Sequence, residues 1–208
     1  MKLAENIEYE KGVLKIAKRT LTPEDELAID FSRICEDAPV EYVLVGGYIA
    51  ILLGRARRTE DVDVVIRADA EAFRNLVHVL ATYGYRAIQG SIPDGVEVLY
   101  RDYLARGLRV RFYKGAIIPN VEVKLSSDFY DEYTLSRSMR VELAGRTIRV
   151  SPPEMAIAYK LYLGSRKDLE DSAFIYRILR PIVNESELLS LSRRLGVEDK
   201  LRLVSQLL

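Results

Sequence analysis

The sequence has one cysteine, no net charge and no apolar run that approaches the length of a membrane-spanning helix. The lone thiol, Cys35, cannot form an internal disulfide, which is typical of proteins from a reducing cytoplasm. A membrane-spanning helix needs about 20 consecutive apolar residues, and their absence excludes a transmembrane protein. Met1 to Glu5 also lack the apolar core of a signal peptide. We therefore expect a cytoplasmic protein with no membrane partner.

The charges balance at 31 basic and 31 acidic residues. A neutral chain does not attract nucleic acid over its whole surface, so any RNA contact must come from a local basic patch. Residues 100–114 contain such an excess, interleaved with aromatic residues and opposed only by Asp102. This pattern suits phosphate contact and base stacking, but it fits a solvated hairpin face equally well. The basic residues are Arg101, Arg106, Arg109, Arg111 and Lys114.

With 49% hydrophobic and 30% charged residues, the chain has the composition of a globular protein. Its 208 residues can bury a sizeable core as one domain, with or without a helical appendage. Asparagine and glutamine are scarce while arginine and glutamate are plentiful, which favours a thermophilic source.

The periodicity of apolar residues predicts an α+β protein with a mixed central sheet flanked by helices. A boundary near Ser151 separates an N-terminal domain, residues 1–151, from a helical segment, residues 152–208. A hairpin over residues 140–150 turns at Ala144-Gly145. The expected helices are 23–36, 48–53, 70–83, 153–163, 167–179, 186–195 and 198–207. The other expected strands are 40–45, 62–66, 96–100, 108–113 and 121–125.

Two carboxylates stand two residues apart in one of these strands. Side chains in a strand repeat with a period of two, so Asp61 and Asp63 share a face while Val62 and Val64 point the opposite way. Two adjacent carboxylates repel each other, and one is normally driven toward its protonated form. A divalent cation removes this penalty, and Mg²⁺ in particular prefers a few carboxylates together with substrate phosphates.

A pair of glycines precedes these acids in the chain. Gly46 and Gly47 follow an apolar strand at the start of an expected helix. Glycine lets the backbone approach a ligand, and free amides at a helix start favour an anion. A phosphate site beside a metal site indicates a nucleotide. Taken alone, either feature also fits a tight turn or a solvated edge strand; the combination, with basic residues between them, favours a site.

These residues resemble a known group of proteins. Gly46-Gly47, a spacer and Asp61-Val62-Asp63 are similar to the signature of the DNA polymerase β-like nucleotidyltransferase superfamily. The segment 151–171 resembles a second motif, with Pro-Glu, a helical lysine and Arg-Lys-Asp, of the AbiEii-type branch of abortive-infection and toxin nucleotidyltransferases. The resemblance spans about residues 40–180 and implies a nucleotidyltransferase fold with this activity.

The resemblance implies a third carboxylate on a neighbouring strand. Glu122 is the candidate, because Val121 and Val123 face one way in its strand and Glu122 the other. A solvent-facing salt bridge is the competing interpretation of this residue. Asp128 and Asp131 are weaker candidates, since they lie beyond the strand and could start a helix. Asp61, Asp63 and Glu122 would then hold Mg²⁺ or Mn²⁺.

The resemblance also places Lys160 and Asp168 at the site. The family has a lysine near the triphosphate, although a lysine on an apolar helix can also extend to solvent. Asp168 lies three residues after Ser165, which has the form of a helix-capping box. Asp171, one turn later, is expected to support the site without touching the substrate.

The expected activity is transfer of a nucleoside monophosphate from a nucleoside triphosphate to a hydroxyl group, with release of pyrophosphate. The family implies an RNA end or a protein side chain as the acceptor. The alternative is a catalytically idle nucleotide-binding module, or one that binds a partner such as an antitoxin or a second copy of the chain. The residues expected to bind the nucleotide are Gly46, Gly47, Arg58, Thr59 and Lys160.

Overall fold

The computed structural model of the chain describes residues 1–206. Within them, ten strands form one mixed sheet in the order β1-β2-β3-β9-β10-β4-β5-β8-β7-β6. The strands are β1 (Lys2–Ala4), β2 (Ile7–Glu10), β3 (Val13–Ile16), β4 (Glu41–Leu44), β5 (Asp61–Arg67), β6 (Arg86–Ala87), β7 (Val110–Lys114), β8 (Ala116–Leu125), β9 (Met139–Leu143) and β10 (Arg146–Val150). The helices are α1 (Pro23–Asp37), α2 (Tyr48–Leu52), α3 (Ala70–Thr82), α4 (Val96–Val98), α5 (Phe129–Ser136), α6 (Pro153–Leu163), α7 (Arg166–Leu179), α8 (Glu185–Arg194) and α9 (Glu198–Gln206).

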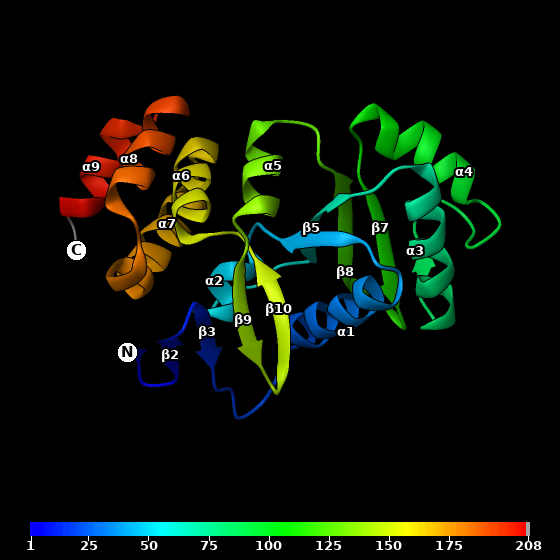
Figure 1. The fold of residues 1–208 in the computed structure, drawn as a ribbon, viewed down its shortest axis with the longest axis horizontal. Coiled ribbons are helices and arrows are strands. Elements are labelled where there is room, and N and C mark those ends of the chain that lie inside the picture. Colours follow the sequence, from blue (N-terminus) through cyan, green and yellow to red (C-terminus); the bar gives the residue numbers. More distant parts are fainter. Residues whose placement is uncertain (207–208) are drawn as a thin grey trace.

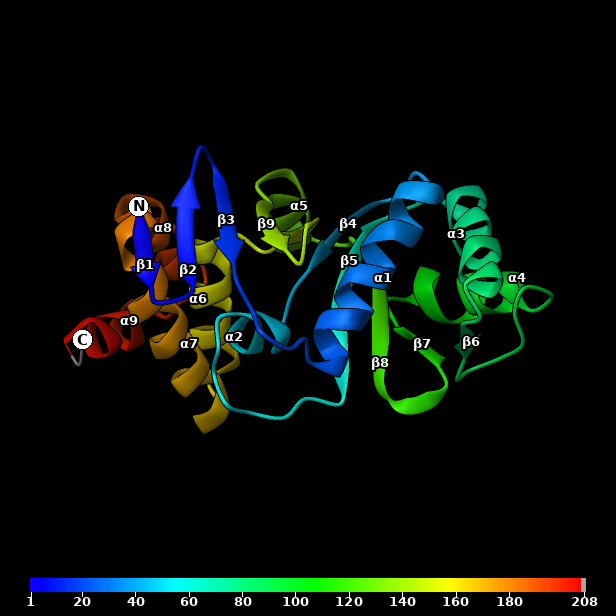
Figure 2. The same ribbon diagram turned by 90° about the horizontal axis from the view of Figure 1, so that it is seen from below.

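The central strands β4 and β5 have α1 on one side and α5 on the other. Figure 1 shows α1 and α5 on opposite sides of the sheet, with α6 to α9 gathered at one end of the molecule and α3 at the other. Figure 2 shows that β1 to β3 lie at the same end as α6 to α9. The expected α+β architecture, a mixed sheet flanked by helices with a helical C-terminal segment, is confirmed.

Alternation of side chains explains why β5 is buried on both faces. Val62, Val64 and Ile66 are fully buried in the main core, which includes apolar residues of α1 and α3. Val65 faces the other way and packs with Val43 and with Leu135 of α5. The face that α5 partly covers is therefore the one that carries Asp61 and Asp63.

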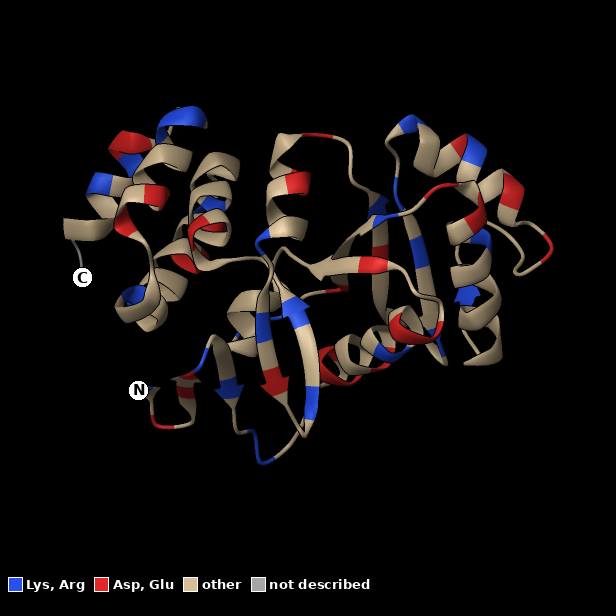
Figure 3. Cartoon of the chain, viewed as in Figure 1, with Lys and Arg blue, Asp and Glu red and all other residues tan. Residues whose placement is uncertain are grey.

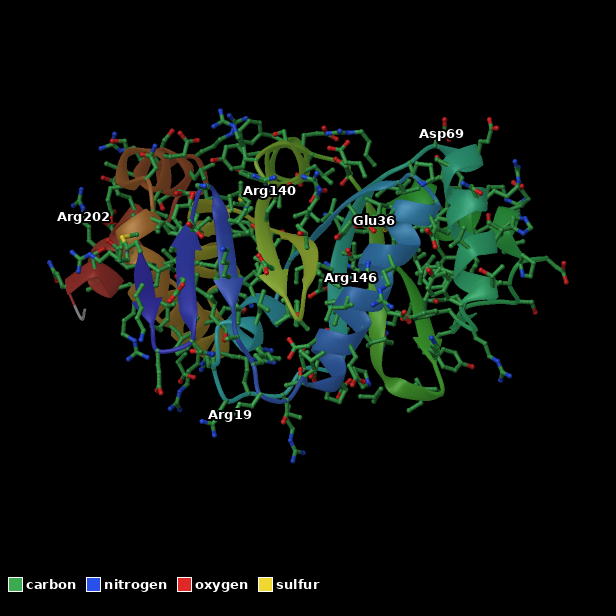
Figure 4. All side chains as sticks on the ribbon, turned by 60° about the horizontal axis from the view of Figure 1, so that its bottom comes forward. Arg19, Glu36, Asp69, Arg140, Arg146 and Arg202 are labelled. Atoms are coloured by element: carbon green, nitrogen blue, oxygen red, sulfur yellow. The ribbon has the colours of Figure 1, made fainter. Side chains whose placement is uncertain are left out.

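Local sequence signals set the helix and hairpin ends that were expected. Thr22 caps α1, with Asp25 completing a capping box, and Pro23 occupies the first turn. The β9–β10 hairpin turns at Ala144 and Gly145, both with positive φ. Buried and exposed residues alternate along both strands of this hairpin, and its exposed positions include Arg140 and Arg146 (Figure 4).

The strand expected at 96–100 is wrong. Residues 96–106 form α4, a π-helical segment (Leu99–Tyr103) and a 3₁₀ turn (Leu104–Arg106). The buried residues Val96 and Leu99 are three apart, which is helical spacing, so packing overrides the β-propensity of the two valines. Strands β1 to β3 and helix α5 were not expected, because short elements carry little periodic signal.

Each helix within residues 1–206 is too short or too polar to cross a lipid bilayer. The division into residues 1–151 and 152–208 stays a prediction. Residue 207, which the sequence assigns to the last helix, lies outside the described residues.

Candidate active site

Strand register brings three carboxylates together. β5 and β8 are parallel neighbours, with Asp61 opposite Asn120 and Asp63 opposite Glu122. One oxygen from each of Asp61, Asp63 and Glu122 lies within 4.8 Å of the others. The third carboxylate expected from the sequence therefore lies beside the first two. Asp128 instead caps α5 through the amide of Asp131.

Burial and mutual repulsion make this cluster unfavourable without a cation. Burial, followed by the charge of Asp61, raises the pKa of Asp63 from 3.8 to about 6, and Arg109 opposes the shift. Burial also acts to raise the pKa of Glu122, but hydrogen bonds and charges from Arg109 and Arg111 outweigh it, so this pKa lies below its ordinary value. Three converging carboxylate oxygens fit a hard divalent cation.

Arg109 provides part of the missing positive charge. Its Nη1 lies 2.9 Å from Oδ1 of Asp63 and also contacts Glu122. Arg111 pairs with the other oxygen of Glu122. Basic residues lie along β7 beside β8 in Figure 3. The side chain of Arg109 is 50% exposed, so it can leave this position without unfolding the sheet.

The Gly-Gly turn fits tightly against this cluster. Gly46 has φ of +70°, and an added Cβ would lie 2.1 Å from Oδ2 of Asp63. The position therefore requires glycine for both its conformation and its space. Gly47 has an ordinary φ, and its added Cβ would lie 2.7 Å from Nη2 of Arg57. Helix α2 then begins at Tyr48.

The loop between α2 and β5 is attached to α7. Asp171 is fully buried and accepts hydrogen bonds from Arg55 and Arg57. Arg57 lines the cavity described below, whereas the exposed Arg58 does not line it within the described chain. Thr59 also lines the cavity and donates a hydrogen bond to Oδ1 of Asp61 at 3.3 Å.

Lys160 is buried and does not extend to solvent. Its Nζ lies 2.7 Å from Oδ1 of Asp168 and 3.1 Å from Oδ2 of Asp171. Ser165 caps α7 by accepting from the amide of Asp168, and its hydroxyl donates to the Asp168 carboxylate. Burial acts to raise the pKa of Asp168, but hydrogen bonds from Lys160 and Ser165 outweigh it and lower this pKa. Asp168 therefore combines the helix-start role with an ion pair to Lys160.

A cavity of about 380 Å³ connects these groups. Asp61, Asp63 and Arg109 lie on its sheet side. The lining also includes Gly46, Gly47, Arg57, Lys160, Lys167 and Asp168. Helix α5, with neighbouring residues of α6 and the end of β8, contributes the residues that we call the α5 wall: Lys124, Tyr130, Asp131, Thr134 and Tyr159.

Sequence reasoning missed part of this arrangement. Arg57, Arg109 and the α5 wall line the cavity but were not among the expected site residues. The basic patch that includes Arg109 was visible in the sequence, but the pairing of Arg109 with Asp63 and Glu122 was not. Asp131 lies in the cavity wall and pairs with Lys124, apart from the carboxylate cluster.

Several solved structures are similar to this chain, including the following two. An antigenic nucleotidyltransferase-like protein from Paracoccidioides brasiliensis is 19% identical, with 82% of this chain and 85% of that chain covered and a TM-score of 0.50. ANT(2")-Ia in complex with adenylyl-2"-tobramycin is 17% identical, with 84% and 98% covered and a TM-score of 0.51. These likenesses show the nucleotidyltransferase fold.

No curated protein sequence matches the chain. The family model for aminoglycoside-2''-adenylyltransferase matches residues 29–175, which include β4, the carboxylate cluster and most of α7. This match confirms the nucleotidyltransferase superfamily that the Gly-Gly and Asp-Val-Asp motifs predicted, without singling out the AbiEii-type branch. The chain therefore belongs to the aminoglycoside-2''-adenylyltransferase family and is a nucleotidyltransferase.

Proposed function

We propose that the protein transfers a nucleoside monophosphate from a nucleoside triphosphate to a hydroxyl group of a nucleic acid end, with a divalent cation bound at the carboxylate cluster. The convergence of Asp61, Asp63 and Glu122 beside a cavity lined by Arg57 and Lys160 carries this proposal. Carboxylates for a cation and basic groups for phosphates are the parts that phosphoryl transfer needs.

The residues present fit Mg²⁺ or Mn²⁺. Asp61, Asp63 and Glu122 would hold the ion, and burial together with the charge of Asp61 raises the pKa of Asp63, a cost that a bound cation would relieve. A bound divalent cation supplies Lewis-acid stabilisation of the charge that develops on the phosphate oxygens. The chain's own residues then position the two substrates.

The triphosphate lies on the wall formed by the Gly-Gly turn and α6 in this proposal. Backbone amides of Gly46 and Gly47, the guanidinium of Arg57 and the ammonium of Lys160 bind its oxygens. Thr59 holds Asp61 in place through its hydroxyl. Arg58 is exposed, so it serves at most at the entrance of the site.

In the transfer step, the acceptor oxygen forms a bond to the α-phosphorus while the bond from that phosphorus to the bridging oxygen of the pyrophosphate breaks. Glu122 is ionised because Arg109 and Arg111 lower its pKa, which makes it a weak base, so it orients the acceptor hydroxyl by accepting its hydrogen bond while the proton leaves to solvent. Arg109 and Arg111 fix the orientation of this carboxylate.

Charge on the acceptor side favours an anionic acceptor. Arg109 and Arg111 flank Glu122, whereas Arg101 and Arg106 pair with Asp102 and Lys114 pairs with Asp30 of α1. The two arginines beside Glu122 favour an acceptor that carries phosphates over a polycationic aminoglycoside. The tobramycin product bound to ANT(2")-Ia therefore does not fix the acceptor here. The narrower resemblance of residues 151–171 to the AbiEii-type branch agrees with an RNA acceptor.

An idle nucleotide-binding module, alone or with an antitoxin or a second copy of the chain, is the second candidate. One observation favours it: the guanidinium of Arg109 lies between Asp63 and Glu122, where a cation would bind.

The test is incubation of the purified protein with each α-labelled nucleoside triphosphate, Mg²⁺ or Mn²⁺, and one acceptor at a time. Total RNA, the protein itself and tobramycin serve as the three acceptors. We expect label on RNA, and none with Asp63→Asn, whose fold is checked by its melting curve. Label only on the protein, or on tobramycin, would show that RNA is not the acceptor and would identify the acceptor as the labelled molecule. Nucleotide binding without any transfer would establish the idle module.

A further inference from the structure

One wall of the cavity has no part in metal or phosphate binding. It contains Tyr130, Asp131 and Thr134 of α5, Tyr159 of α6 and Lys124 near the end of β8. In the proposed function, Gly46, Gly47, Arg57 and Lys160 bind the triphosphate, and the acceptor lies beside Glu122 and its arginines. The α5 wall is therefore the part of the cavity left for the rest of the nucleotide.

Asp131 is held in this wall by one of its two carboxylate oxygens. Oδ2 accepts hydrogen bonds from the amide of Ser127 at 3.1 Å and from its hydroxyl at 3.3 Å, and it lies 2.8 Å from Nζ of Lys124. Among residues 1–206, no group donates a hydrogen bond to Oδ1. Asp131 is buried but lines the cavity, so Oδ1 is an oriented acceptor that a ligand can reach.

The ion pair with Lys124 decides what Asp131 can bind. Lys124 already neutralises the carboxylate, so a second cation gains little there, and Asp131 lies apart from the metal-binding cluster. A neutral N–H donor, in contrast, gains a charge-assisted hydrogen bond to Oδ1. Nζ of Lys124 has further hydrogens for an acceptor atom next to that N–H.

Two aromatic rings flank this polar pair. The centroids of Tyr130 and Tyr159 are 6.4 Å apart, with the rings inclined at 54°, and both rings line the cavity. Tyr159 is 38% exposed, which leaves part of its ring free for a ligand. A flat heterocycle with N–H and carbonyl or ring-nitrogen groups on its edge matches both the rings and the polar pair.

We propose that the α5 wall is the nucleobase subsite of the enzyme, with Tyr159 as a stacking surface and Asp131 as the residue that selects among bases. This inference rests on the proposed function, because it assumes that a nucleoside triphosphate occupies the cavity. Tyr159 binds every base face, whereas Asp131 and Lys124 bind only a base whose edge presents a donor next to an acceptor at that position. A buried hydrogen-bonding group strongly disfavours a ligand that leaves it unpaired.

The experiment measures dissociation constants of the four nucleoside triphosphates, as non-transferable α,β-methylene analogues with Mg²⁺, by titration calorimetry. Inorganic tripolyphosphate is the probe that lacks a base. In the wild type we expect about a tenfold or larger difference between the tightest and weakest nucleotide, since the site is built to hydrogen-bond one edge. Asp131→Asn keeps the shape and an oxygen for the Ser127 amide but presents an N–H in place of Oδ1, so it should bind the preferred nucleotide of the wild type about tenfold more weakly and change the order of affinities.

Tyr159→Leu should weaken all four nucleotides by about tenfold without changing their order, because stacking is tolerant of base identity. Both variants should bind tripolyphosphate as the wild type does. Tyr162→Leu is the matched control: its ring lies 5.7 Å from that of Tyr159 on the same helix but does not line the cavity, so all affinities should stay unchanged. Because Tyr159 is partly exposed, we expect Tyr159→Leu to fold. This variant still tests the subsite if Asp131→Asn does not fold.

Equal affinities for all four nucleotides in the wild type, or an unchanged order and spread of affinities in Asp131→Asn, would overturn the assignment of Asp131. Unchanged nucleotide affinity in Tyr159→Leu would overturn the stacking role. If the wild type binds nucleotides tightly, either of these two results leaves the proposed function intact. If the wild type binds neither nucleotide nor tripolyphosphate, both the proposed function and the nucleobase subsite are wrong.

Discussion

The backbone of Gly46 lies so close to Asp63 that a methyl group on Gly46 would stand 2.1 Å from Oδ2 of Asp63. Gly46→Ala must therefore displace the carboxylate as well as adopt a positive φ, which costs about 1–2 kcal/mol for a residue with a side chain. Gly54→Ala is the matched control, because Gly54 has φ of +98° and nothing within 4 Å of its added Cβ.

We expect both alanine variants to lower the free energy of unfolding, measured with urea, and only Gly46→Ala to abolish nucleotide transfer. Equal transfer rates in the two variants would show that the contact with Asp63 has no bearing on the site.

The elevated pKa of Asp63 predicts a pH dependence for the metal-free protein. The folded-state pKa is about 6 and the ordinary value is 3.8, so the folded protein binds more protons between these values. The contribution of Asp63 to stability is thus complete below pH 3.8 and is lost as the pH rises through 6.

The measurement compares melting temperatures of wild type and Asp63→Asn in EDTA from pH 4 to pH 7. The wild type should lose stability relative to the variant as the pH rises, and Mn²⁺ should restore it most strongly above pH 6. A constant difference between the two proteins across this range would contradict the pKa shift.

Replacing Arg109 should strengthen metal binding but lower the stability of the metal-free protein. Its guanidinium neutralises Asp63 and Glu122 in the arrangement described here, so Arg109→Met should lower the melting temperature in EDTA. The same change removes a cation that competes with the metal, so Mn²⁺ should bind several-fold more tightly, as measured by calorimetry. Unchanged Mn²⁺ affinity would mean that Arg109 does not occupy the metal position.

Asp168 tests whether capping and site chemistry can be separated. In Asp168→Asn the backbone amide still donates to Ser165, so the helix start is kept and the melting temperature should change little. The variant leaves Lys160 with Asp171 as its remaining carboxylate partner among the described residues. We expect transfer to fall by about tenfold or more, as for loss of an oriented charge in a site. A lower melting temperature with normal transfer would assign Asp168 to the cap alone.

The sequence predicted the carboxylate cluster because the period of two in a strand is a local property. The faces of Asp61, Asp63 and Glu122 could be read from their own neighbours, and only the register between β5 and β8 was needed to join them. The choice between Arg57 and Arg58 was different. Which arginine turns inward depends on Asp171, and no local pattern in the loop contains that information.

The α5 wall was missed for a related reason. Helix α5 is eight residues long and buries the polar Asp131 and Thr134 beside Leu135, so it has no clear apolar stripe. The sequence left Asp128 open as a weaker metal ligand or the start of a helix, and the structure shows that it caps α5. Polar residues buried at a site weaken the periodicity on which helix prediction depends.

The attachment of Arg57 to Asp171 has a consequence for the order in which the enzyme matures. The two residues are 114 positions apart in the chain. On the ribosome, β4, β5 and β8 are complete well before α7 is made, so a nascent chain can gather its carboxylates while the loop with Arg57 still has no anchor. Synthesis of α7 therefore sets the earliest moment at which the phosphate side of the site can take its final form.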